Sequence, residues 1–169
     1  MKFRRIVLVL TISLLSFTLF NCGSKKEASS EQTLETKKVV KDEIDLKTQE
    51  GYEKVITSLG ITIFENSELK ELKKSDFYGN EVIEYTIPVG EGTPFADHKA
   101  AEDSLKSFYK AELEAKLIPD GWNKSIGGDE NRMMFIKTGG KVKMFTVSIF
   151  PSMAENDSTK KTYLFNYSD

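Results

Sequence analysis

The second half of the chain places one long helical pattern before segments that all have strand patterns, and this order restricts the fold strongly. Residues 97–117 place apolar side chains at helical spacing. Pro119-Asp120-Gly121 ends the helix, and four segments with strand composition follow it: 122–126, 132–138, 141–150 and 161–167. Two glycines at 139–140 suit a tight hairpin. The order predicts an antiparallel β-meander with the long helix packed on its apolar face.

The residues before this helix add a shorter helix. It runs from near Asp45 to Gly60, and its apolar stripe consists of Tyr52, Val55, Ile56 and Leu59. Gly60 stands where a helix-ending glycine is expected. Residues 61–64 have the pattern of a short buried strand, and residues 65–80 are predicted to form a polar loop.

Residues 81–89 then alternate between apolar and mixed positions, which predicts a half-buried strand. Pro88 marks either the end of this strand or an edge position in the sheet, because proline cannot donate to a strand ladder. Residues 45–169 are therefore predicted to form a single α+β domain. A domain of this length buries enough surface for one hydrophobic core.

The N-terminus has the layout of a secretory signal. Lys2, Arg4 and Arg5 precede an apolar run over residues 6–20, which only serine and threonine interrupt. The run is shorter than the ~20 residues that a membrane-spanning helix needs. A basic start followed by such a run is typical of a signal peptide. Cys22, the only cysteine of the chain, follows almost at once.

A cysteine at this place, with Leu19 three residues before it, resembles the lipobox of bacterial lipoproteins. In that family signal peptidase II cuts before the cysteine, which carries a diacylglyceryl group. The resemblance implies a signal peptide over residues 1–21, lipidation of Cys22 and attachment to a membrane through that lipid. Phe20 and Asn21 stand where small residues are usual, as in the relaxed lipoboxes of spirochaetes and some other bacteria. The alternatives are an uncleaved signal anchor and cleavage elsewhere with loss of the cysteine.

Residues 22–44 are predicted to form a flexible, lipid-anchored tether, since they contain no aromatic residue and too few apolar ones to offset chain entropy. In proteobacterial lipoproteins an aspartate after the cysteine retains the protein at the inner membrane. Gly23 and Ser24 follow Cys22 here, so the resemblance implies delivery to the outer membrane. Removal of residues 1–21 would leave 21 basic and 26 acidic side chains, which gives a net charge of −5.

A second resemblance concerns the long helix and the residues after it. Phe108-Tyr109 with Leu113, followed by Gly121-Trp122, resembles small extracytoplasmic bacterial domains in which a helix reading F-Y-x-x-x-L leads into G-W and a meander. It covers about residues 60–167, with more residues between Leu113 and Gly121 than is usual. Those domains mostly have no known activity, so the resemblance implies a fold and no chemistry.

Composition excludes several classes of function. One cysteine excludes an intramolecular disulfide and a thiolate zinc site, and one histidine excludes the two-histidine motif of zinc peptidases. The chain has 24 basic and 26 acidic side chains and no basic cluster in its body, which argues against binding of nucleic acid. It has no phosphate loop and no dinucleotide fingerprint, so no cofactor is expected.

The polar candidate residues have simpler structural interpretations. His98 stands in the first turn of the long helix without a nucleophile motif, which predicts a surface histidine. Asp120 and the cluster 129–131 offer oxygen atoms, but the spacing of a calcium loop is missing. Phe108 and Tyr109 could stack on a ligand, although their helical spacing favours core packing.

Trp122 is predicted to close the junction between helix and sheet, with its N–H bonded to a carbonyl.

Together these patterns predict a lipoprotein of the bacterial cell envelope that is not an enzyme and binds a protein or a small ligand. Its expected partners are the membrane, through Cys22, and an envelope protein. The alternative is an assembly accessory that pairs through an open strand edge, for which the aromatic face of residues 163–167 is the motive. A hydrolase is less favoured and would need two converging acids with raised pKa.

Overall fold

The computed structural model describes residues 44–169, which fold as one α+β unit, and the predicted fold class is confirmed. The elements of this part are α1 Gln49–Ser58, β1 Glu68–Lys74, β2 Glu81–Pro88, α2 His98–Leu117, β3 Asn123–Lys124, β4 Arg132–Lys137, β5 Lys143–Ile149, the 3₁₀ helix η1 Ser152–Ala154 and β6 Lys160–Ser168. The predicted signal peptide, the lipidation site Cys22 and the tether up to residue 43 lie outside the described residues.

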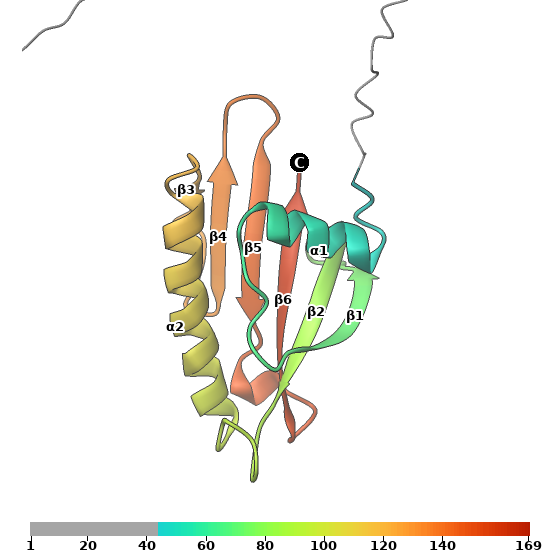
Figure 1. Cartoon of the computed structure of the whole chain (residues 1–169), viewed down its shortest axis with the longest axis vertical. Helices are drawn as coiled ribbons and strands as arrows, with labels where there is room; N and C mark the ends of the chain where they lie inside the picture. The colour runs from blue at the N-terminus through green and yellow to red at the C-terminus, as the bar shows by residue number, and fades with distance from the viewer. Residues whose placement is uncertain (1–43) are drawn as a thin grey trace, which may run out of the picture. The chain divides into compact units, whose positions relative to one another are not determined.

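The six described strands form one antiparallel sheet with the order β1-β2-β6-β5-β4-β3. Strands β3 to β6 are the predicted meander, because each pairs with the next along the chain. β2 then pairs with β6, from Val82 opposite Asn166 to Pro88 opposite Lys160. The hairpin of β1 and β2 therefore extends the meander, and β6 lies in the middle of the sheet (Figure 1).

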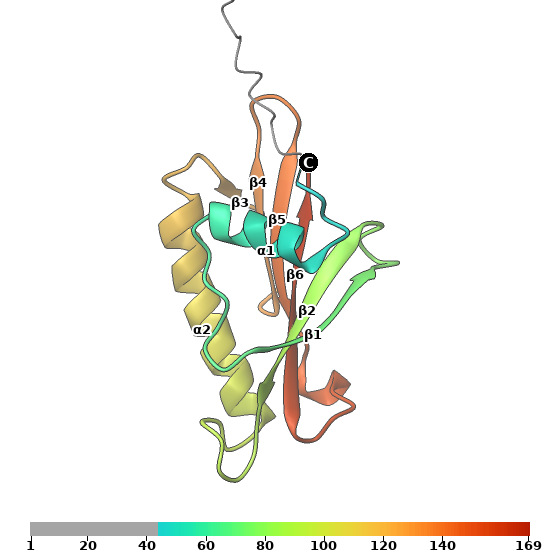
Figure 2. The ribbon, with the colours of Figure 1, turned by 45° about the vertical axis from the view of Figure 1, so that its right-hand side comes forward.

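Both helices cover the same face of the sheet, with α1 lying across the strands and α2 running along them (Figures 1 and 2). Each helix begins at a polar cap: the side chain of Thr48 accepts from the backbone N–H of Gly51, and that of Asp97 accepts from Ala100. Gly60 has a φ of 72°, which a glycine adopts without strain, and so it ends α1 as predicted. Neither described helix is long and apolar enough to cross a membrane.

The space between helices and sheet is filled by one cluster of buried apolar side chains. It includes Tyr52, Val55 and Ile56 of α1, Leu105, Tyr109 and Leu113 of α2, Ile83 and Ile87 of β2, Phe145 and Val147 of β5, and Tyr163 and Phe165 of β6. Core packing of Tyr109 is thereby confirmed, and Phe108 packs against the same cluster while half-buried. Since residues 44–169 contain the whole sheet, both helices and this core, a piece with these limits has what it needs to fold by itself.

Tyr52 joins α1 to the two central strands. Its hydroxyl lies 3.1 Å from the carbonyl oxygen of Glu81 and 3.2 Å from that of Phe165, and it accepts from the backbone N–H of Tyr167 at 2.7 Å. Burial raises the pKa of Tyr52 well above its ordinary value, so the hydroxyl stays protonated. One side chain of α1 thus fixes the helix over the β2–β6 pair.

Two predictions before β2 are wrong. Residues 61–64 form no strand, because their backbone bonds to side chains of α2: Thr62 donates to the Glu112 carboxylate at 3.1 Å, and Phe64 donates to the Tyr109 hydroxyl at 3.0 Å. Within the predicted loop 65–80 the structure has β1, whose Leu72 lies opposite Ile83 on β2.

The face of the sheet away from the helices is also buried over β2, so the prediction of a half-buried strand is wrong for β2. Glu84 points to this face and is 2% exposed, with ion pairs to Lys70 at 3.2 Å and Lys73 at 2.9 Å. The turn between β1 and β2 bonds to β5, where the Tyr78 and Ser148 hydroxyls are 2.8 Å apart. Polar side chains therefore cover this face where the first face has helices.

Candidate functional site

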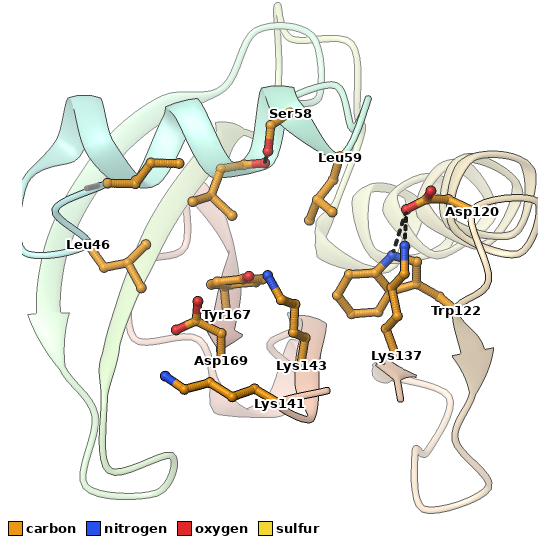
Figure 3. Close-up of a pocket in the computed structure, with 12 residues that line it drawn as sticks. Leu46, Ser58, Leu59, Asp120, Trp122, Lys137, Lys141, Lys143, Tyr167 and Asp169 are labelled. Atoms are coloured by element: carbon orange, nitrogen blue, oxygen red, sulfur yellow. Dashed lines mark hydrogen bonds and ion pairs between the residues drawn. The ribbon is translucent and has the colours of Figure 1, made fainter. Parts of the chain in front are cut away.

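A cavity of about 670 Å³ lies between α1, the β4–β5 hairpin and the turn that follows α2 (Figure 3). Small-molecule sites in proteins have volumes of ~300–1,000 Å³, so the cavity can hold a ligand of that class. Ile44, the first described residue, lines the cavity together with Leu46. Ile44 is the last residue of the predicted tether, so the cavity includes the start of the described chain.

One wall of the cavity is apolar. Its apolar side chains are Leu46, Val55 and Leu59, and Trp122 and the ring of Tyr167 lie across from Leu59 (Figure 3). Val55 faces the cavity because it belongs to the buried stripe of α1, and Leu59 is the C-cap residue of the same helix. The cavity thus combines residues from the N-terminal part of the domain, from the end of α2 and from β6.

Trp122 is held in the cavity wall from two sides. Its backbone N–H donates to the carbonyl of Leu117 at 3.0 Å, and its indole N–H donates to the Asp120 carboxylate at 3.2 Å. The residue is 3% exposed, so it closes the junction between helix and sheet as predicted. The predicted carbonyl acceptor is wrong, since the indole bonds to a carboxylate.

The β4–β5 hairpin brings three lysines to the cavity, Lys137, Lys141 and Lys143, and the Asp169 side chain lines it as well (Figure 3). Lys137 forms an ion pair with Asp120 at 2.8 Å. The hydrogen bond from Lys137 lowers the pKa of Asp120 below its ordinary value, and the hydrogen bond from Trp122 contributes less to the same shift. No ion pair or side-chain hydrogen bond joins Lys141 or Lys143 to another residue within 44–169, and both line the cavity.

The hairpin brings Lys137 and Lys143 directly opposite each other across β4 and β5. Opposed residues of an antiparallel pair share one face of the sheet, and like charges at such positions repel. Gly139 and Gly140 turn the hairpin with φ values of 132° and 145°, which other residues adopt only under strain. A two-residue turn at Gly139-Gly140 would place Lys137 opposite Val142, so the sequence analysis did not find this pair. The observed connection between β4 and β5 runs over residues 138–142.

The other candidate residues lie apart from the cavity, except for Asp120. His98 is half-buried at the first turn of α2, and residues 129–131 form the turn before β4. Among the described residues, no three side chains of the His, Cys, Asp or Glu type converge as a metal site would require. Asp120 serves the cavity wall as a partner for Trp122 and Lys137.

Clear pKa shifts of carboxyl groups in the described part are all downward. They occur at Glu71, Glu102, Glu114, Asp120 and Asp157. Burial acts to raise the pKa of Glu102, but hydrogen bonds from Lys106, Ser152 and Lys161 outweigh it and lower the pKa to about 2. A general acid needs a raised pKa, so none of these five groups is suited to that role.

Most of the cavity cannot be predicted from the sequence, because its wall joins residues more than 100 positions apart.

We compared the chain with models of protein families, with curated proteins and with solved structures, and none of them matches it.

Proposed function

We propose that the chain is a lipid-anchored protein of the bacterial cell envelope whose domain binds a small ligand without transforming it. The observation that carries the ligand site is the cavity that combines apolar side chains with lysines of the β4–β5 hairpin. Ligand sites in proteins are commonly concave and mostly apolar, with a few polar groups that orient the ligand. The cavity combines both kinds of group, with Leu59 and Trp122 among its apolar side chains and Lys143 among its polar ones.

The anchor in this proposal rests on residues 1–23. Two or three acyl chains at Cys22 would hold the protein on a membrane, since each buried CH₂ contributes ~0.8 kcal/mol and a single chain binds only reversibly. Residues 22–44 would serve as the tether, and Gly23 with Ser24 favours the outer membrane as destination. A ligand site beside Ile44 would then lie at the end of the domain from which the tether departs.

The alternative of an assembly accessory has less support. β6, which carries the aromatic face of residues 163–167, has strands on both sides and no open edge. The edge strands are β1, which is interrupted by a bulge between Leu69 and Glu71, and β3, which has two residues. Bulges and very short strands are the devices by which proteins prevent pairing at an edge.

The anchor is tested by metabolic labelling with palmitate in cells that produce the wild-type chain or the Cys22→Ser variant. We expect label in the wild type and none in the variant, because the thiol is the attachment point. Equal labelling of both proteins would show that the proposed anchor is wrong.

The ligand site is tested by native mass spectrometry of the protein purified from envelopes. We expect a small molecule to accompany the wild type and to be lost from Leu59→Trp, because the larger side chain fills the cavity at its wall. Ile126→Trp is the matched control, since Ile126 is fully exposed and does not line the cavity. Identical spectra for the wild type and Leu59→Trp would contradict a small-ligand function.

A further inference from the structure

One lysine of the hairpin beside the cavity, Lys143, forms no ion pair with the described residues. Lys137 and Lys143 face each other across β4 and β5, and Asp120 pairs with Lys137 at 2.8 Å. Lys143 has no counter-ion within 4 Å among residues 44–169, although it is only half-exposed. Lys141 of the same hairpin has no ion pair within residues 44–169 either, and the Asp169 side chain also lines the cavity (Figure 3). Local arrangements that cost stability are commonly found at functional sites.

A second donor lines the same cavity. Tyr167 is 8% exposed, and its backbone groups are used: the N–H donates to Tyr52 and the carbonyl accepts from Asn80. Its side-chain hydroxyl has no hydrogen-bond partner among the described residues. Figure 3 shows Tyr167 and Lys143 together on the cavity wall, across from Leu59 and beside Trp122.

We infer that the cavity binds an amphipathic anion: one carboxylate or phosphate group on an apolar body. This inference rests on the proposed ligand site and adds the chemical class of its ligand. Lys143 would form the ion pair, the Tyr167 hydroxyl would donate to the same head group, and the apolar body would lie against Leu59 and Trp122. Charge-assisted hydrogen bonds of this kind are stronger than neutral ones, and the low exposure of Tyr167 favours them further.

The lysines also have a simpler interpretation as partners of helix C-termini. α1 and α2 both end near this cavity, at Ser58 and Leu117, and a cation next to a helix C-terminus is stabilising. Lys116 already stands in the last turn of α2. Dipole compensation requires neither two lysines directly opposite each other nor a free hydroxyl beside them, so it leaves the arrangement unexplained.

The test uses residues 44–169 and the fluorescence of Trp122, the one tryptophan of the chain. Dodecanoate and dodecyl phosphate are titrated as monomers, with dodecyltrimethylammonium as the probe of opposite charge and acetate as the head group alone. We expect both anionic amphiphiles to bind, and the other two probes to bind at least ~10-fold more weakly. Lys143→Gln should lower the affinity for dodecanoate by ~10-fold or more, and Tyr167→Phe should lower it to a smaller degree.

Lys124→Gln is the matched control, because Lys124 pairs with Glu114 and does not line the cavity. Vesicles with and without phosphatidylglycerol identify the source of the anion. If the protein binds the anionic vesicles and Lys143→Gln weakens this binding, the anion is a lipid headgroup. If the protein binds only the monomeric probes, the anion is a free amphiphile. Either result supports the inference.

Equal binding of the cationic and anionic probes, or no effect of Lys143→Gln, would overturn the inference. The proposed function would still stand if a small molecule accompanied the wild type in native mass spectrometry and was lost from Leu59→Trp. If no amphiphile binds and no small molecule accompanies the protein, the proposed function fails together with the inference.

Discussion

The Lys161 ammonium of β6 lies 3.3 Å from the Glu102 carboxylate of α2, inside the domain, with the lysine side chain fully buried. Lys161 also bonds to the carbonyl of Phe150 and lies 3.7 Å from the Glu155 carboxylate. Glu102 in turn accepts from the backbone and hydroxyl of Ser152. This network joins α2, η1 and β6 at the end of the sheet away from the β4–β5 hairpin (Figure 1).

Removal of Lys161 should destabilise the domain strongly. Lys161→Met keeps the apolar stem but leaves the Glu102 and Glu155 carboxylates without their shared buried cation, and loss of one partner from a buried pair costs ~3–5 kcal/mol. Urea unfolding followed by circular dichroism measures the loss. Lys160→Met is the control, because the pair of Lys160 with Glu68 is exposed, and exposed ion pairs contribute little to stability. Equal losses in the two variants would contradict this account.

The same network makes stability depend on pH in the acid range. The pKa of Glu102 is about 2 in the folded protein and near 4.5 in the unfolded chain, so the unfolded state binds a proton first as the pH falls. The stabilisation is present above pH 4.5 and is lost as the pH drops toward 2. Glu102→Gln should therefore be less stable than the wild type at pH 7 and lose less stability between pH 4.5 and 2. The free energy of unfolding in urea is measured for both proteins over this pH range. Equal pH dependence of the two would show that Glu102 is not the group responsible.

The Tyr52 hydroxyl should contribute more to stability than that of Tyr78. Tyr52→Phe removes an oxygen that contacts three backbone groups in the core, and an unsatisfied buried group costs ~1–3 kcal/mol. Tyr78→Phe removes one bond to Ser148 at a half-buried position, for which we expect a loss below ~1 kcal/mol. Thermal and urea unfolding of both variants provide the comparison, and the reverse order would refute the structural role given to Tyr52.

Gly51→Ala should destabilise the domain, although alanine in place of glycine ordinarily stabilises a helix by ~1 kcal/mol. A Cβ at this position would lie 2.0 Å from the carbonyl oxygen of Asp45, so the chain before α1 would have to move. That movement would also disturb Leu46 at the cavity wall. Ser107→Ala on the exposed side of α2 is the control and should change the unfolding free energy by no more than ~0.5 kcal/mol. A stabilised Gly51→Ala variant would contradict the predicted clash.

The helices and the meander could be predicted from sequence because their signals are local. α2 has a regular apolar stripe, an aspartate cap and a turn after its last residue, and the structure places it at His98–Leu117 against a prediction of 97–117. The strands of the meander were found from alternation and glycine turns in the same way. Where the apolar period and the caps agree, the fold follows from neighbouring residues alone.

β1 and residues 61–64 illustrate why other parts could not be predicted. β1 reads ELKELKK, and its membership of the sheet depends on the partner β2, which supplies Tyr85 opposite Leu69 and Ile83 opposite Leu72. Residues 61–64 have strand composition, but the Tyr109 hydroxyl and the Glu112 carboxylate take up two of their backbone N–H groups. Both outcomes depend on tertiary contacts, which override local preference.

The cavity could be predicted only in part. The sequence shows lysines on both arms of the glycine hairpin, but a two-residue turn would place Lys137 opposite Val142. The pairing of Lys137 with Lys143 follows from the longer connection in the structure. The approach of Leu46 and Tyr167 to these lysines could not be predicted from the sequence, because the residues are separated by most of the domain. Cys22 lies outside the described residues, and its lipidation stays a prediction.

The charged outer strand has a consequence for a protein confined to a membrane as proposed. Molecules restricted to a surface meet their own copies far more often than the same number dispersed in a volume, and each encounter tests exposed strand edges for aggregation. Along β1 only Leu69 and Leu72 are apolar, and the remaining positions are lysine and glutamate. If the domains are anchored as proposed, the lysines and glutamates of β1 disfavour edge-to-edge pairing between neighbouring copies.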